Sequence, residues 1–404
     1  MNQMLEYSTD TTTWNTFDTT VNISLLNTGD KLYVRGILRG NNTNVDFTQF
    51  AMTGKISISG SINAIWDYIN LEAQLKEYCG YCMFLNCSSL TKAPKLPATA
   101  LANNCYINMF ANCTSLVAAP ELPATTLTDW CYQNMFANCT SLVTAPELPA
   151  TALADYCYCQ MFYNCTSLTE APKLPATTLT EGCYYGMFVN CVSLTTTPEL
   201  PALILAKRCY YAMFYNCAGL ITSMEILPAT DLLETTWTLA GFGNSESNYS
   251  NNNDSRAINE GVYHSMFWGC TSLTTAPILP AKQLSPGCYN SMFNNCRKLT
   301  KVIILAENLH VTISDESFNT VVELANDYNG QANRAWMELN AAVCWIDHSG
   351  NITTRKFYVP ESAINDWNSQ STYFTHVFAD NMEIISQEEI DNIIRRYNIV
   401  YTKR

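Results

Sequence analysis

The sequence predicts a repeat solenoid of short α/β coils, with a small domain before it and a cap after it. Met-Phe pairs recur every 26 residues from Met83-Phe84 to Met213-Phe214, and the pairs at Met266 and Met292 are again 26 residues apart. The chain of 404 residues is 48% hydrophobic and only 14% charged, so it can bury a large core. A unit of this length cannot bury its apolar side alone, so neighbouring units must stack.

Residues 1–66 lack the repeat pattern and carry strand-like runs, which predict a small antiparallel, β-sandwich-like domain. Strand-like runs at 21–26 and 31–36 are joined by the turn-forming residues 27–30, which favours a hairpin. We expect this domain to cover the first coil, because an open solenoid end exposes core and strand edge.

Residues 67–320 form the predicted array, and the unit at 127–150 illustrates it. In its first half, apolar residues follow Thr128, a candidate N-cap, at helical spacing, which predicts a short helix or helical turn. Its second half carries two prolines among leucine and alanine. Since proline cannot donate to a ladder, any strand there should be only about three or four residues long.

The array is interrupted between Met213 and Met266, which lie 53 residues apart, two periods plus one. This gap predicts one degenerate coil, around 236–242, and an insertion, together spanning 231–262. The polar run at 243–255 is either a tolerated surface insertion or a ligand-contacting loop.

Residues 321–404 are predicted to be a C-terminal cap ending in a helix. Ser386 to Glu389 reads as a capping box, and apolar residues from Ile390 to Tyr397 follow on one helix side. The basic end suits a helix C-terminus and a solvated tail, with a docking peptide for a partner as the alternative.

The repeat core Met-Phe-x-Asn-Cys-Thr-Ser-Leu-Thr, as at 161–169, and the following Ala-Pro-x-Leu-Pro-Ala-Thr resemble the BspA-like leucine-rich repeats of surface proteins from gut Bacteroidetes and their phages. The resemblance covers about residues 70–320, with a longer period than the commoner form. It implies a curved solenoid of leucine-rich-repeat type with a parallel sheet along one side, and attachment or recognition more often than catalysis. Residues 357–367 resemble the closing segment of such proteins, a strand, a proline and a short helix.

Charge and hydropathy exclude several functions. The net charge is −13, which repels phosphate backbones, so we expect no nucleic-acid partner. No apolar run approaches the roughly 18 residues that span a bilayer, so no membrane insertion is expected. The first ten residues lack the pattern of a signal peptide. The resemblance to surface proteins implies an extracellular, cell-surface or virion protein, which would then be either trimmed of an export signal or brought to its place by assembly.

No catalytic, cofactor or metal site is predicted. The four histidines are scattered, and no nucleophile motif or phosphate-binding glycine loop occurs. His264 lies inside a repeat and is interpreted as a surface substitution, with a catalytic base as the alternative. Fifteen of the 18 cysteines occupy two places eight residues apart, which favours buried free thiols, with a disulfide ladder as the alternative. Cys79 and Cys82 make a lone pair without a histidine at ligand spacing.

Ligand-binding residues should vary between coils while the core stays fixed. Aromatic residues recur at such variable positions, and we predict that they form the binding surface: Trp130, Tyr156, Tyr163, Tyr185, Tyr211, Tyr215 and Trp268. The alternative is that they pack on neighbouring coils. A second variable row is either a solvated edge or a recognition strip: Lys95, Glu121, Glu147, Lys173 and Glu199.

The sequence therefore favours a non-enzymatic recognition or attachment protein, displayed on a bacterial surface or as a phage tail or fibre component. Its expected partner is a surface protein or glycan of a bacterial or host cell, and the end domains could hold other virion proteins. The alternative is an architectural virion or cell-surface spacer without a ligand on the solenoid.

Overall fold

The computed structural model describes most of the chain and divides it into two compact units, residues 1–175 (unit 1) and 176–404 (unit 2), which are treated separately below. The described residues are 4–17, 22–37, 49–67, 69, 75–230, 232, 261–282, 284, 288–289, 292–307, 356–364 and 382–401.

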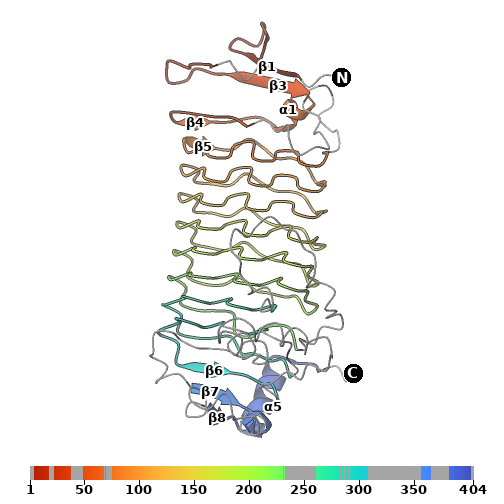
Figure 1. The fold of residues 1–404 in the computed structure, drawn as a ribbon, viewed down its shortest axis with the longest axis vertical. Helices are drawn as coiled ribbons and strands as arrows, with labels where there is room; N and C mark the ends of the chain where they lie inside the picture. Colours follow the sequence, from red (N-terminus) through yellow and green to blue (C-terminus); the bar gives the residue numbers. More distant parts are fainter. Residues whose placement is uncertain are drawn as a thin grey trace, which may run out of the picture. The chain divides into compact units, whose positions relative to one another are not determined.

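Successive repeats stack on one another within each unit (Figure 1). In unit 1, parallel bridges join the same place of successive coils, as in Ala118↔Thr144↔Glu170. In unit 2, Thr196 bridges Thr222 in the same way. The chain therefore has a repeat fold in which each coil pairs with the coil one period away.

The first half of each coil is not a helix, so that prediction is wrong. Between residues 101 and 113 the chain makes consecutive turns, and the N–H of Met109, for example, donates to the carbonyl three residues back. Alternate residues donate to the next coil, as Asn108 does to Gln133 at 2.9 Å. Asn104, Asn108 and Asn112 have φ of 62°, 53° and 63°, which an α-helix does not contain. Tight turns that return the chain to one side every few residues imitate helical spacing.

Columns of identical side chains fill the interior of the coils. In unit 1, Phe110 stacks on Phe136 with ring centroids 5.7 Å apart, and in unit 2 Phe188 stacks on Phe214 at 5.6 Å. A parallel column holds fully buried tyrosines, such as Tyr132. Burying one such phenyl ring contributes about 1.5–3 kcal/mol, so the columns supply much of the stability.

The repeated cysteines are buried free thiols in the described part of the chain. Those at the second place in the repeat donate to the carbonyl of a phenylalanine of the preceding coil, as Cys139 does to Phe110 at 3.1 Å and Cys217 to Phe188 at 3.0 Å. The cysteines are thus buried free thiols, as the first interpretation expected, and no disulfide ladder forms among the described residues. Their hydrogen bonds between coils are a feature that the sequence analysis did not predict.

The N-terminal strands form one three-stranded antiparallel sheet of order β2-β1-β3, made of β1 (Met4–Ser8), β2 (Asn15–Thr16) and β3 (Tyr33–Ile37). The predicted hairpin is wrong. Its turn forms, since the N–H of Asp30 donates to the carbonyl of Asn27, but residues 22–26 are not a strand and β3 pairs with β1 instead.

The array begins earlier than the predicted boundary at residue 66. Phe50 stacks on Phe84 at 5.5 Å, and Cys87 donates to its carbonyl at 3.0 Å, as in the later coils. The strand β4 (Ile56–Ser57) pairs in parallel with β5 (Leu90–Lys92), and the short helix α1 (Asn63–Trp66) places Trp66 on Tyr106. Residues 49–66 are thus a first coil that carries no Met-Phe pair.

The predicted degenerate coil is also wrong. Residues 236–242, where it was placed, lie outside the described residues, but the coils on either side of the gap are in direct contact. Phe214 stacks on Phe267 at 5.5 Å, and Cys270 donates to the carbonyl of Phe214 at 3.1 Å. These are the contacts of adjacent coils, so no coil lies between them in the stack. The polar run 243–255 also lies outside the described residues.

The C-terminal end continues the parallel pairing. The strands β6 (Lys301–Ile303), β7 (Lys356–Val359) and β8 (Met382–Ile384) form a sheet of that order, and residues 361–364 after Pro360 are helical, as predicted. The helix α5 (Gln387–Arg396) begins at the predicted cap, where the N–H of Glu389 donates to Ser386 Oγ. An apolar cluster joins this helix to the coil end: Leu305, Ile385, Ile390 and Ile393.

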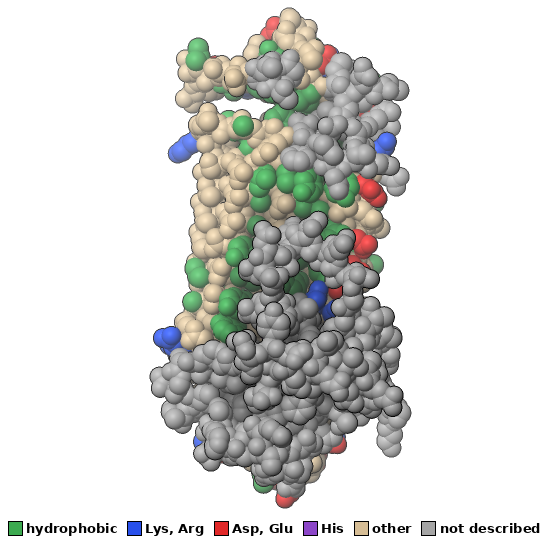
Figure 2. Space-filling model, viewed as in Figure 1, with side chains coloured by type: hydrophobic (Ala, Val, Ile, Leu, Met, Phe, Trp, Pro, Cys, Tyr) green, Lys and Arg blue, Asp and Glu red, His purple; other side chains and the backbone are tan. Residues whose placement is uncertain are grey.

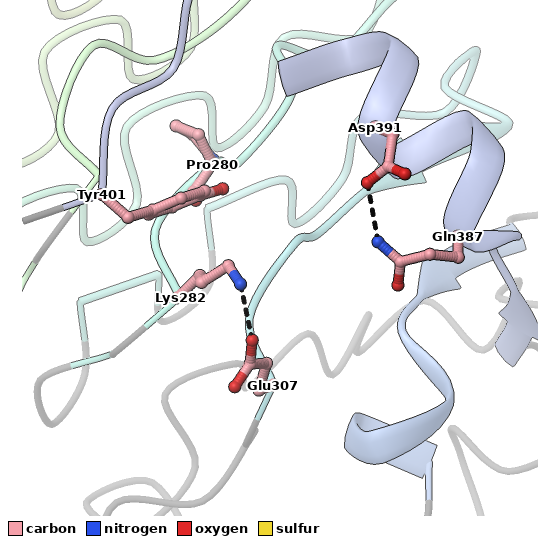
Figure 3. Close-up of polar contacts among 6 residues, drawn as sticks. All are labelled: Pro280, Lys282, Glu307, Gln387, Asp391 and Tyr401. Carbon is pink, nitrogen blue, oxygen red and sulfur yellow. Dashed lines mark hydrogen bonds and ion pairs between the residues drawn. The ribbon is translucent and has the colours of Figure 1, made fainter. Parts of the chain in front are cut away.

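The tail after α5 is held against the coils, which corrects the expectation of a solvated tail (Figure 3). Tyr401 Oη donates to the carbonyl of Pro280 at 3.0 Å, and Lys282 lies over its ring while pairing with Glu307 at 2.7 Å. Tyr397 Oη donates to Glu225 at 2.8 Å. Residues 402–404 lie outside the described residues.

Candidate functional site

All seven predicted ligand-binding residues are half-buried, and they lie at three places of the repeat outside the core columns, so that they form three rows. The leading row lies just before the first repeated cysteine and includes Trp130 and Tyr156. The middle row lies two residues after that cysteine and includes Tyr185 and Tyr211. The trailing row follows the Met-Phe pair and includes Tyr163, Tyr215 and Trp268.

In unit 1 the leading row holds one aromatic pair. Trp130 and Tyr156 stack with ring centroids 4.4 Å apart and planes 7° from parallel. Both have positive φ, 64° and 54°, a region that side chains larger than asparagine rarely adopt. The N–H of Trp130 donates to the carbonyl of Asp155 at 2.9 Å, so the bond to the next coil holds this conformation.

In unit 2 the middle and trailing rows both contain aromatic stacks. Tyr185 stacks on Tyr211 at 4.7 Å, and Tyr211 stacks on His264 at 4.8 Å, with planes within 7° of parallel. Tyr215 stacks on Trp268 at 5.7 Å. Three successive coils therefore present a continuous stack of three rings, next to a second stack of two rings on the last two of these coils.

His264 belongs to this site, although the sequence analysis interpreted it as a surface substitution. Burial lowers its pKa to about 4, so the ring is neutral near pH 7, and its Nδ1 has no hydrogen-bond partner among the described residues. Its register could have revealed it, because His264 lies 53 residues after Tyr211, the same step that separates the two Met-Phe pairs across the gap.

The seventh predicted residue, Tyr163, stands apart. It is half-buried in the trailing row of unit 1, where the preceding coils carry the buried Ala111 and Ala137. The structure thus brings six of the seven residues into ring stacks on neighbouring coils, the arrangement that the alternative interpretation expected. Their role in ligand binding stays a prediction.

The stacking decides what these rings can offer to a ligand. Tyr211 has a ring on both sides, so its faces are occupied and the edge is the part that reaches solvent. A ring edge carries positive partial charge, and a tyrosine hydroxyl both donates and accepts hydrogen bonds. The rows are therefore suited to polar ligands that bind through hydrogen bonds and edge contacts.

The charged row and the residues next to the parallel bridges lie on other parts of the coil. All five residues of the charged row are exposed: Lys95, Glu121, Glu147, Lys173 and Glu199. The residues just before the parallel bridges expose β-branched side chains, such as Val117 at 53% in unit 1 and Ile221 at 49% in unit 2. Figure 2 shows hydrophobic side chains reaching the surface among polar and backbone atoms on the face that it presents.

The buried thiols are poor nucleophiles. Burial raises the pKa of Cys165 and of Cys217 to about 12, so both stay protonated near pH 7. Within the described ranges, no three His, Cys, Asp or Glu side chains gather where they could hold a metal ion. The helices in those ranges are also too short or too polar to cross a membrane.

Comparisons with known proteins place the chain in no family. No family model matches it, and no curated protein matches it. Among solved structures, it is similar to the crystal structure of a leucine-rich repeat protein from Bacteroides ovatus, with 14% identity over 78% of this chain and 88% of that chain and a TM-score of 0.21. A likeness at this TM-score carries no argument, so the repeat fold rests on the contacts between coils.

Proposed function

We propose that this protein is a non-enzymatic recognition or attachment protein, a leucine-rich-repeat solenoid of BspA-like type that binds a cell-surface protein or glycan. We further propose display on a bacterial surface or in a phage tail or fibre. The observation that carries the proposal is the set of aromatic stacks on outward rows, where the same rows of other coils hold non-aromatic residues such as Asn104, Gln133 and Ala137. The resemblance of the repeat core to surface proteins of gut Bacteroidetes supports the proposed setting.

The physical reason is that these rings are not needed to fill the core. The interior columns are already complete in the repeats that carry these rings, from Tyr106 to Phe293, with buried phenylalanine, tyrosine and methionine. Half-exposed aromatic rings in a contiguous group favour partner binding, since they combine large contact area with hydrogen-bonding groups.

Binding of the purified full-length chain to intact gut Bacteroidetes cells and to their extracted surface glycans tests the proposal. We expect saturable binding that weakens when Trp130, Tyr156 and Tyr185 are replaced together by alanine. Unchanged binding of that variant would remove those positions from the site, and no saturable binding across a broad panel of cells would contradict the proposal.

One observation favours the alternative, an architectural spacer. Six of the seven aromatic residues stack on neighbouring coils, so they also contribute to the cohesion of the array. A spacer predicts that deletion of one internal repeat, residues 130–155, shortens the protein but leaves its assembly with partners intact. If the protein acts in recognition, the same deletion removes the Trp130–Tyr156 stack and should weaken binding to the partner.

A further inference from the structure

We propose that the middle and trailing rows of unit 2 bind an extended carbohydrate chain that runs along the stack of coils. This inference rests on the proposed function and names its ligand class. The residues that carry it are the stack Tyr185–Tyr211–His264 and the stack Tyr215–Trp268. Each of the three coils adds one ring to the middle row, so this row is periodic.

The distance between successive rings can be compared with the repeat distance of each class of ligand. Ring centroids lie 4.7, 4.8 and 5.7 Å apart along the rows. In an extended peptide, residues on one face recur about every 6.7 Å, so a peptide lying along the rows loses register by roughly 1–2 Å per coil. The pyranose rings of an extended 1,4-linked glycan follow one another at a step close to that of the coils. Neighbouring β-linked sugars are turned over, but both edges of each sugar carry oxygen atoms, so successive sugars can still hydrogen-bond to successive rings.

A helical peptide has a compatible pitch of about 5.4 Å, but its mode of binding differs. Amphipathic helices bind by laying an apolar face into a hydrophobic groove. The rings of the middle row are stacked face to face, so they present edges instead of a broad apolar face. A ligand rich in hydroxyl groups matches edges that carry tyrosine hydroxyls and the Trp268 N–H.

The same rows in unit 1 carry only single tyrosines. The middle row there runs from the half-buried Tyr81 to the buried Ile107, Gln133 and Cys159, and the trailing row carries the buried Ala111 and Ala137 before Tyr163, so neither tyrosine continues as a stack along unit 1. The proposed carbohydrate site is therefore confined to the coils between residues 182 and 270.

The test is titration calorimetry of the full-length chain with defined oligosaccharides of a β-1,4-glucan, a β-1,4-mannan, a β-1,4-xylan and an α-1,4-galacturonan, from disaccharide to octasaccharide. We expect at least one series to bind, with affinity that rises until the chain spans the three rings of the middle row. Tyr211→Ala should weaken binding about ten-fold or more, because it removes the central ring. Ile221→Ala, an exposed site on the same coil, is the matched control and should bind as the unaltered protein does.

Tyr215→Phe is the second variant, and it keeps the ring while removing one hydroxyl. We expect it to fold with an unchanged melting temperature and to bind more weakly, so the inference stays testable if Tyr211→Ala does not fold. Absence of binding in every series, affinity independent of chain length, or equal losses in Tyr211→Ala and Ile221→Ala would overturn it.

A parallel cell-binding assay separates this inference from the proposed function. Cells are treated either with periodate, which oxidises sugar diols, or with protease. Loss after periodate alone supports the carbohydrate site. Loss after protease alone overturns it and leaves recognition of a protein in place. No binding to untreated cells contradicts the proposed function itself.

Discussion

The coils of unit 1 between residues 104 and 139 and the coils of unit 2 between 182 and 270 have the same interior and different outward rows. Inside, both contain buried Met-Phe pairs and thiols that donate to phenylalanine carbonyls. Outside, the middle row changes from the buried Ile107 and Gln133 to the stacked Tyr185, Tyr211 and His264. The interior is therefore set by stacking, and the outward rows are free to differ because the core does not depend on them.

The comparison predicts its largest effect in the interior. Phe136→Ala empties a place in the phenylalanine column between Phe110 and Phe162, and we expect it to lower the free energy of unfolding by about 3–5 kcal/mol. Urea unfolding followed by circular dichroism measures the change. Val143→Ala, an exposed site in the same repeat, is the control, and an equal loss in both variants would break the distinction between interior and outward places.

The next effect depends on pH and comes from an outward row. Folding lowers the pKa of His264 to about 4 from its usual 6.5, so below pH 6.5 the unfolded chain binds more protons than the native state. The contribution of the neutral His264 ring to the free energy of unfolding is fully present above pH 6.5. It decreases by up to about 3 kcal/mol as the pH falls towards 4. His264→Phe keeps the stack on Tyr211 and should flatten the difference between pH 7 and pH 4. An unchanged pH profile in this variant would show that other groups cause it.

A smaller effect is expected where a row of asparagines contains one glycine. Gly269 has φ of 73°, and a Cβ there would run into the side-chain amide of Asn216. Gly269→Ala should therefore cost about 1–3 kcal/mol in unfolding free energy. The double variant with Asn216→Gly removes the collision, so it should be more stable than expected from the two single changes. Additive losses would argue that the two coils do not touch there.

The smallest effect concerns the tail. Tyr401→Phe removes the hydrogen bond to the carbonyl of Pro280 and should lower the free energy of unfolding by about 0.5–1.5 kcal/mol. Thermal unfolding measures the difference, with Tyr33→Phe, on an exposed edge of the N-terminal sheet, as the control. If Tyr401→Phe matched the unaltered protein, the tail would contribute nothing to the cap.

The sequence predicted features that local chemistry determines. The period is visible because the core columns require the same residue in every coil, and the Ser386 cap is visible because its bond spans three residues. The helix prediction failed because successive turns place apolar residues at nearly helical intervals. The coil at 49–66 was missed because Phe50 is its only residue that matches the Met-Phe pattern, at an offset of 34 residues from Phe84.

The candidate site was predictable in its residues but not in its geometry. Variation between coils identified the aromatic positions, yet their mutual stacking follows from the exact register of the coils across the gap. The 53-residue step puts Tyr211 and His264 in one row, but a degenerate coil between them would keep them apart, so their contact is visible only in the structure. The docked tail was likewise hidden, because Tyr401 and Pro280 lie 121 residues apart.

The central claim is that the residues of the interior rows stabilise the fold and the residues of the outward rows bind the partner. The most direct test measures unfolding free energy and cell binding for Tyr211→Ala and Phe214→Ala, which lie three residues apart on one coil. We predict that Tyr211→Ala costs about 1 kcal/mol and abolishes most binding, whereas Phe214→Ala costs about 3–5 kcal/mol and binds normally below its melting temperature. Normal binding by Tyr211→Ala, together with a stability loss equal to that of Phe214→Ala, would contradict the claim.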